Sequence, residues 1–278
     1  MGLSKSAVGK SVGRLEESLG TRLLARTTRS LNLTAEGKTY YRSCLRVLDE
    51  LGSVEALLAS HRQEAAGLLR VSLPVSFGQR WVMPVLHEIA QRHPKVSLEA
   101  SFADRRVDLI EEGVDLVVRL GDPGDQANLV GRRIGVNRSV LCASPAYLAA
   151  KGRPQSLDEL ESHDCVAFAR DGRPLPWLLA NAKGHRVNVN IKPRHTISHA
   201  DALRDAALAG LGLAYLSTWL AADGLRTGRL ECVLTPESID DMPIYVLWPR
   251  SRDLAPKVSV AVDALVKAFL PIPPWERA

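Results

Sequence analysis

Hydroxyl and cationic side chains gather near the start of this sequence. Ser6, Lys10 and Arg14 fall on one face of a predicted helix, Ser4–Leu19, and further arginines follow between short apolar runs. Serine hydroxyls can bond phosphates or base edges, and lysine and arginine can reach a guanine edge or neutralise a phosphate. This pattern suits the major groove of DNA, but an ordinary amphipathic surface helix followed by a basic hairpin would show it too.

The charge of the chain is unevenly distributed. Residues 1–46 contain nine Lys or Arg and three Glu, a balance of +6, whereas the remaining residues sum to −1. A basic segment on a near-neutral body is the electrostatic footprint of nucleic-acid binding. A solvated basic surface without a partner is the alternative, so the charge supports DNA binding without establishing it.

The other face of the same helix is apolar. Its stripe repeats at helical spacing and consists of Val8, Val12, Leu15 and Leu19. Ser4 is a suitable N-cap, and Gly20 suits the left-handed position that ends a helix. Interior glycines such as Gly9 cost about 1 kcal/mol relative to alanine, which close approach of the backbone to DNA would offset.

The order of these residues resembles a known DNA-binding unit. The pattern S-x-S-A-V-x-K-x-V-x-x-L-E-x-x-L-G, followed by R-L-L-x-R-T-T-R-x-L-x-L-T-x-E-G, resembles the winged helix-turn-helix of LysR-type transcriptional regulators. The resemblance makes Ser4–Leu19 the recognition helix and places Arg26 and Arg29 in the wing. The sequence departs from the family at Gly9, often a serine there, and in starting almost on the recognition helix. The implied contacts to double-stranded promoter DNA are Ser4, Lys5, Ser6, Lys10, Arg14, Arg26 and Arg29.

Residues 35–63 contain neither proline nor a turn cluster and predict one long helix. Its 3-4 repeat comprises Tyr41, Cys44, Leu48, Leu51 and Leu58, with Glu55 interrupting. Such a helix would be roughly 43 Å long, and its apolar face would be buried by self-pairing. The resembled family dimerises through this linker helix, so we expect a dimer or tetramer that places recognition helices on DNA half-sites.

Alternating strand and helix patterns after the hinge 64–68 predict an α/β region with a parallel sheet. Strands are expected at LLRVSL, at 96–102 and 115–119, in two runs within 129–143 that are separated by Val136-Asn137-Arg138, and at 165–169, 187–192 and 243–249. The segment AGLGLAYL is expected to form a turn that leads into a further strand. Pro74 to Gly78 is expected to turn into a helix that runs to about Arg92, with Pro84 at a kink or N1. Further helices are expected at 107–112, 145–151, 156–161 with Ser156 as cap, 201–209, 218–222 and 256–270.

This layout resembles the effector-binding domain of LysR-type regulators, with two α/β subdomains of the periplasmic-binding-protein type. Its cues are G-x-L-R-V, G-V-D-L-V-V-R, S-P-A-Y-L and G-L-G-L-A. The fold class is therefore α/β: a partial winged helix-turn-helix head (1–34), a linker helix (35–66) and an effector-binding domain (67–278). The first subdomain would span about 70–142 and 243–270, and the second about 143–242, with hinges near 142 and 242.

Ligands of such folds bind between the subdomains, at carboxyl ends of strands and at helix N-termini, which suit carboxylates. The resemblance implies a small organic effector, with an anion favoured. The matched candidates are Ser76, Phe77, Phe102, Arg119, Ser198 and His199. The serines could equally be N-caps, Arg119 a surface arginine and His199 a capping or core histidine.

Catalysis, cofactors and metals find little support in the sequence. G-x-S-x-G, H-E-x-x-H and the P-loop are absent, and the four cysteines form no C-x-x-C. No apolar run spans a membrane and no signal region begins the chain, so we expect a cytoplasmic protein. The predicted function is an effector-responsive LysR-type regulator. The alternatives are a truncated family member that binds effector and self-associates but not DNA, and an α/β solute-binding protein or enzyme.

Arg29→Ala tests the wing assignment. The variant should bind DNA more weakly and with a smaller salt dependence, because one phosphate contact and its released counterion are lost. Anisotropy titrations of the gene's upstream DNA at several salt concentrations measure both quantities. Unchanged affinity across those concentrations would contradict the assignment.

Overall fold

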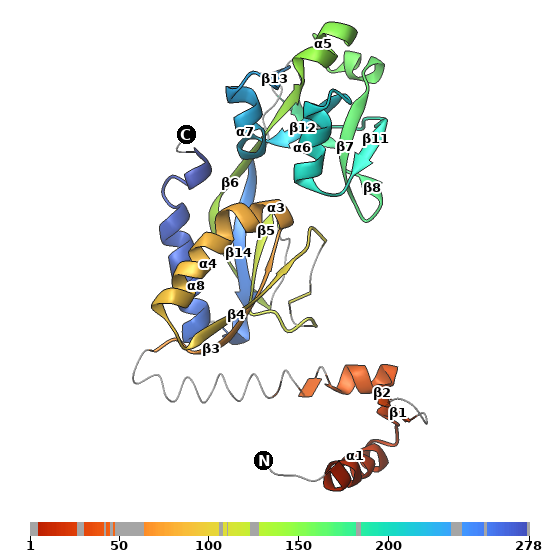
Figure 1. Cartoon of the computed structure of the whole chain (residues 1–278), viewed down its shortest axis with the longest axis vertical. Helices are drawn as coiled ribbons and strands as arrows, with labels where there is room; N and C mark the ends of the chain where they lie inside the picture. Colours follow the sequence, from red (N-terminus) through yellow and green to blue (C-terminus); the bar gives the residue numbers. More distant parts are fainter. Residues whose placement is uncertain are drawn as a thin grey trace.

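The computed structural model of the chain describes residues 5–26, 31–41, 43–44, 47, 64–105, 108–109, 111–122, 128–181, 185–234, 241–252 and 255–276 (Figure 1). The described residues form three parts. The head comprises the described residues before 48. The first lobe carries the strands between residues 67 and 120 together with the last long helix. The second lobe carries the elements between residues 144 and 233. The predicted α/β class is confirmed.

The head contains the expected helix and two-stranded wing. Its elements are α1 (Lys5–Leu19), β1 (Leu24–Arg26), β2 (Leu31–Leu33), antiparallel to β1, and a helix described from residue 35. Gly20 has a φ of 63°, which confirms the left-handed end of α1. Glu16 then orients the wing, because its Oε1 accepts the backbone N–H groups of Leu23 at 2.7 Å and Leu24 at 2.9 Å.

The T-x-E-G sequence at residues 34–37 closes the head. The Oγ1 atom of Thr34 accepts the N–H of Gly37 at 2.9 Å and donates to the carbonyl of Arg22 at 2.8 Å. A side-chain oxygen that accepts an N–H in the first helical turn is an N-cap interaction. Gly37 lies so close to the wing that a Cβ there would be 1.9 Å from the carbonyl oxygen of Leu23. Only glycine fits this approach.

The first lobe is built on parallel strands, as predicted. Its elements are β3 (Gly67–Leu73), α3 (Val75–Phe77), the π-helical turn η2 (Gly78–Val82), α4 (Met83–Arg92), β4 (Val96–Phe102), β5 (Leu116–Leu120) and α8 (Pro256–Phe269). β3 pairs in parallel with both β4 and β5. Pro84 is the second residue of α4, one position after the N1 place expected for it and still within the first turn.

Two long antiparallel strands connect the lobes: β6 (Leu129–Ala143) and β14 (Asp241–Pro249). β14 pairs with β5 and with β6 over Leu129–Arg138, whereas β12 of the second lobe pairs with β6 over Ser139–Cys142. The two lobes therefore share one ten-stranded mixed sheet, in the order β11-β7-β12-β6-β14-β5-β3-β4 with β8 and β13 attached (Figure 1).

The second lobe packs short helices around the other end of this sheet. Its helices are α5 (Pro145–Lys151), the 3-10 turn η3 (Asp158–Ser162), α6 (Ala200–Leu208) and α7 (Thr218–Arg226). Its strands are β7 (Cys165–Arg170), β8 (Arg173–Pro174), β9 (Trp177–Ala180), β10 (Arg186–Val189), β11 (His195–Ile197), β12 (Leu213–Ser217) and β13 (Glu231–Cys232). β11 and β12 pair in parallel with β7.

Several sequence expectations need correction. Residues 129–143 form one strand rather than two runs, and the expected strand 187–192 is the shorter β10. The helix expected at 156–161 is the 3-10 turn η3, whose N-cap is Leu157 instead of Ser156. The described residues 109 and 111–113 form turns where a short helix was expected. Most of the predicted linker helix, residues 48–63, lies outside the described residues.

The terminal helix α8 is apolar enough to resemble a membrane span. By length and composition alone, Pro256–Glu276 could cross a bilayer. In the fold, Val258, Leu265 and Phe269 are buried in the main core cluster beside α4. Lys257 also bonds the fully buried Asp115 at 2.9 Å, which ties α8 to the sheet. The helix is therefore a core element.

Gly37→Ala tests the close approach within the head. Forcing a methyl group against a backbone carbonyl should destabilise the head by about 1–3 kcal/mol. Hydrogen exchange of the α1 and wing amides measures the opening of the head separately from the lobes. Gly9→Ala is the matched control, because no atom lies within 4 Å of its added Cβ. It should stabilise α1 by about 1 kcal/mol. Equal amide protection in both variants would contradict the packing.

Candidate functional site

A cavity of about 630 Å³ lies between the two lobes. This volume is in the range of small-molecule sites, roughly 300–1,000 Å³. The carboxyl ends of four parallel strands open into it, contributing Pro74 after β3, Gly121 after β5, Arg170 at the end of β7 and Ser217 at the end of β12. Open α/β sheets bind ligands at such ends.

The crossing strands supply the floor of the cavity. Asn137 and Ser139 of β6 are buried and line it, together with Met242 and Pro243 of β14. The amide of Asn137 is fixed, because its Oδ1 accepts a hydrogen bond from the indole Nε1 of Trp219 at 2.7 Å. A polar residue at the middle of β6 therefore joins the floor of the cavity to α7 of the second lobe.

Charged side chains line the cavity from both lobes. They are Asp104, Arg105, Arg119, Asp122, Arg170 and Arg186. Glu112 engages Arg105 through two contacts of 2.8 and 3.0 Å. The Nε atom of Arg170 is buried and has no hydrogen-bond partner among the described residues. The arginines outnumber the carboxylates, so the cavity offers donors to an anion.

Asp104 sits in a less hydrated place than an ordinary carboxylate. Burial raises its pKa above the usual value, while a hydrogen bond from the backbone of Val75 and the charges of Arg170 and His199 oppose the rise. The bond from Val75 to Oδ1 is 3.2 Å long. Asp104 thereby holds the turn between β3 and α3 at the edge of the cavity.

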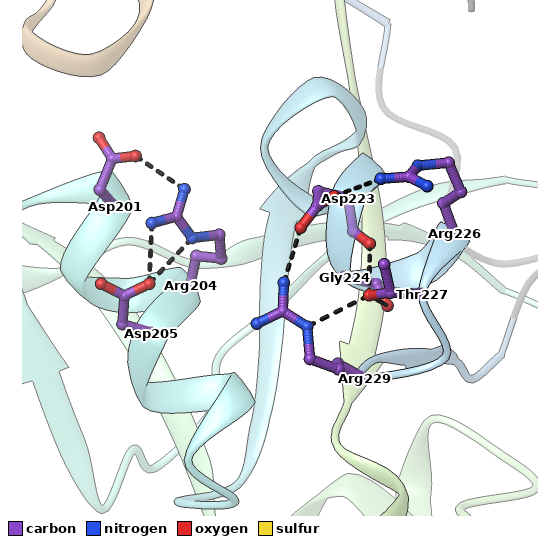
Figure 2. A network of polar contacts seen from close by, with 8 residues as sticks. All are labelled: Asp201, Arg204, Asp205, Asp223, Gly224, Arg226, Thr227 and Arg229. Carbon is purple, nitrogen blue, oxygen red and sulfur yellow. Dashed lines mark hydrogen bonds and ion pairs between the residues drawn. The ribbon is translucent and has the colours of Figure 1, made fainter.

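A polar contact joins the lobes beside the cavity. The hydroxyl of Ser76, on α3, donates to Oδ2 of Asp201, on α6. Arg80 reaches the same carboxylate at 3.8 Å and lies 5.7 Å from the ring centroid of Trp219. Figure 2 shows the other side of Asp201, where Arg204 bridges it to Asp205. Asp201 thus accepts groups from both lobes.

The structure brings together some of the predicted effector residues. Ser76, Phe77 and Arg119 line the cavity. Phe102 is 42% exposed and lies outside the lining, against Gly78. Ser198 is also outside it. His199 is the N-cap of α6, where its Nδ1 accepts from the N–H of Ala202 at 3.4 Å. This is the capping role that the sequence left open.

Other lining residues escaped the sequence reasoning. The expected strand 165–169 stopped one residue before Arg170, which is the last residue of β7. Asn137 stood in an expected break between two strands. Asp104 is the last residue of the segment 102–104, which follows a predicted strand and was indicated for inspection, although Asp104 itself was not named as a candidate.

The head exposes part of its predicted polar face. Lys10 and Arg14 are exposed on α1, one helical turn apart. Lys5 and Ser6 belong to α1 and Arg26 to β1, but their side chains are outside the described set. Ser4 and Arg29 also lie outside the described residues.

Comparisons with known families agree with a DNA-binding head on a ligand-binding body. The LysR substrate binding domain matches residues 62–270, and the bacterial regulatory helix-turn-helix of the lysR family matches residues 1–38. The chain therefore belongs to the LysR family of transcriptional regulators, whose members bind DNA and small-molecule effectors and form oligomers.

Individual relatives are similar over nearly the whole chain. The transcriptional regulator DmlR of Escherichia coli K12 is 32% identical over 97% of this chain and 87% of DmlR. The solved structure of CrgA from Neisseria meningitidis is 31% identical, with a TM-score of 0.65 over 96% of this chain and 90% of CrgA. Full-length AphB, a virulence activator of Vibrio cholerae, is 28% identical, with a TM-score of 0.68 over 96% of this chain and 91% of AphB. These relatives are regulators, which removes the enzyme alternative.

Asp104→Asn tests the electrostatics of the cavity. The raised pKa means that ionisation costs the folded state more than the unfolded chain. The protonated carboxyl therefore contributes stability that is fully present below the ordinary pKa of an aspartate. This stability is lost as the pH rises through the higher pKa of the folded state. The variant should therefore be more stable than the parent at pH 7, and the difference should vanish in acid.

Urea unfolding at a series of pH values measures this difference. Asp223→Asn is the control of opposite sign, since hydrogen bonds from Arg226 and Arg229 lower the pKa of Asp223 despite the opposing effect of burial. That variant should gain no stability at pH 7. A loss of stability for Asp104→Asn across the whole range would contradict the account.

Proposed function

We propose that the cavity between the lobes binds a small organic anion and that this binding controls how the head engages promoter DNA. The observation that carries the proposal is the buried Nε of Arg170, which has no hydrogen-bond partner in the described part of the chain and lies in a cavity that Arg119 and Arg186 also line. A buried polar group without a partner costs free energy, and an anionic ligand would relieve that cost.

The rest of the cavity favours an organic anion over an inorganic one. Aromatic and apolar side chains of both lobes line it, including Phe77, Phe168, Trp177, Trp219 and Leu247. Ligand sites typically combine such walls with a few polar groups that fix orientation. A carbon skeleton with one or more carboxylates would use both kinds of lining. We keep Phe102, Ser198 and His199 as further candidates only for a rearranged, ligand-bound state.

The head supports DNA binding through its exposed cations. Lys10 and Arg14 present their charges on the same face of α1. We propose that they contact DNA together with Ser4, Lys5, Ser6, Arg26 and Arg29, that linker helices pair two or four chains, and that the protein acts in the cytoplasm. Phosphate contacts by these cations would make binding strongly salt-dependent.

One observation favours the alternative, a family member that binds effector but not DNA: apolar surface on the predicted recognition helix is left uncovered. Leu19, at the end of the apolar stripe of α1, is 43% exposed. It borders a groove of about 480 Å³ that Leu23 and Tyr40 also line. Anisotropy titration of the gene's upstream DNA against random duplex decides between the two functions. Equal affinity for both duplexes would favour the alternative.

Replacing cavity arginines separates effector binding from DNA binding. Arg119→Ala and Arg170→Ala should each weaken effector binding about tenfold to a hundredfold, because hydrogen bonds to charged groups contribute roughly 1.5–3 kcal/mol. Both variants should bind DNA as the parent does, since neither residue lies in the head. Thermal-shift screening with small mono- and dicarboxylates identifies an effector, and titration with it measures the change.

Arg226→Ala is the matched control. It removes the same charge from the surface of α7, where Arg226 pairs with Asp223 at 2.7 Å (Figure 2). This variant should retain the affinity for the effector. If it loses as much affinity as the two cavity variants, the cavity assignment is wrong.

A further inference from the structure

Two of the four cysteines face each other across neighbouring strands. In the antiparallel pair of β6 and β13, Cys142 lies directly opposite Cys232. The N–H of Val233 donates to the carbonyl of Leu141 at 2.9 Å, so the adjacent pair, Val233 and Leu141, is the hydrogen-bonded one. Because the two kinds of pair alternate along antiparallel strands, the cysteines occupy a non-hydrogen-bonded pair.

This position brings the two thiols close together. Opposed residues of such a pair have Cα atoms about 4.5 Å apart and side chains on the same face. That separation falls within the range of disulfides, about 4.4–6.8 Å. In addition, burial raises the pKa of Cys142 to about 12, and a charge on Cys232 contributes to the rise. The second effect means that a charge on Cys232 acts on the sulfur of Cys142.

The remaining described cysteines are placed differently. Cys165 lies on β7 opposite Leu213 of β12. It packs in the cluster of Leu141 and Ala143, which alternate along β6 with Cys142 and so occupy the other face of the sheet. Cys44 belongs to the head. Cys142 and Cys232 are therefore the matched pair among the thiols of the lobes.

We propose that Cys142 and Cys232 are a modification site, a dithiol that a hydroperoxide converts to a reversible cross-strand disulfide. The half-buried thiolate of Cys232 attacks the peroxide oxygen and becomes a sulfenic acid, which releases water from hydrogen peroxide. The thiolate of Cys142 then attacks the sulfenic sulfur of Cys232. The S–S bond forms, and the sulfenic oxygen leaves as a second water. Two electrons pass from the thiols to one peroxide, and a dithiol reductant reverses the reaction.

The position of the pair gives the bond a structural consequence. β6 carries the chain into the second lobe, and β13 is the last described strand before β14 carries it back. A bond between them would close residues 142–232 into a loop at the neck of the second lobe, on the same strand, β6, that contributes Asn137 and Ser139 to the cavity floor. β13 contains only two residues, so it can adjust to the geometry of the bond.

Peptide mapping of the full chain tests the proposal directly. The native protein is incubated with hydrogen peroxide, free thiols are alkylated in denaturant, and tryptic peptides are identified by mass. Cleavage after Arg138, Lys151 and Arg229 separates the two cysteines into different peptides. Burial raises the pKa of both thiols, so oxidation needs hours and excess peroxide. We expect the 142–232 peptide pair in roughly tenfold excess over other pairings, since the strand register gives these two cysteines a disulfide-compatible spacing.

Three variants sharpen the result. Cys142→Ser and Cys232→Ser should each abolish the linked peptide, whereas Cys165→Ser should leave it unchanged. Cys165 is a matched control because burial raises its pKa to about 12 as well. The map of the parent chain does not depend on whether a variant folds. The proposal is overturned if Cys142 stays open to alkylation, if it joins Cys165, if the link joins two chains, or if it forms only after denaturation.

Discussion

The two strands that cross between the lobes constrain the rest of the structure. β6 pairs with β14 along its first part and with β12 along its last, so both lobes are hydrogen-bonded to one continuous backbone. A rotation of the lobes must therefore bend these strands near Arg138 and Ser139, where the pairing changes. The same stretch lines the cavity. The place that would bend and the place that would bind a ligand are adjacent residues of one strand.

The sequence predicted the elements whose patterns are local. The apolar run of β5 was predicted from its pattern, whereas Arg119, near its carboxyl end, was named through the resemblance to the family. The predicted break between two strands around Asn137 was wrong, and the reason is physical. Val136, Asn137 and Arg138 were interpreted as a break, because polar residues interrupt the apolar pattern. In the structure the strand continues, and the buried Asn137 is polar because it meets the cavity and the indole of Trp219.

Contacts between distant segments had no local signal. Ser76 and Asp201 are 125 positions apart, and each looked like a capping residue or the start of a helix on its own. Arg170 was one residue beyond an expected strand. In the head, by contrast, the physical reason for the motif is local. Thr34 caps a helix and Gly37 makes room for the carbonyl of Leu23, so the spacing T-x-E-G could be recognised from sequence alone.

The bond between Ser76 and Asp201 limits what a ligand can do at the edge of the cavity. A serine hydroxyl has one hydrogen to donate, and Asp201 already accepts it. A ligand oxygen that needs this hydrogen must replace Asp201, whereas a ligand donor can be added without loss. Replacement would not leave Asp201 unpaired, because Arg204 holds it at 3.0 Å. It would, however, remove one contact between the lobes. Ligands that accept from Ser76 therefore weaken the contact between the lobes, whereas ligands that donate to it leave the contact in place. Differential affinity of this kind is what a regulated equilibrium requires.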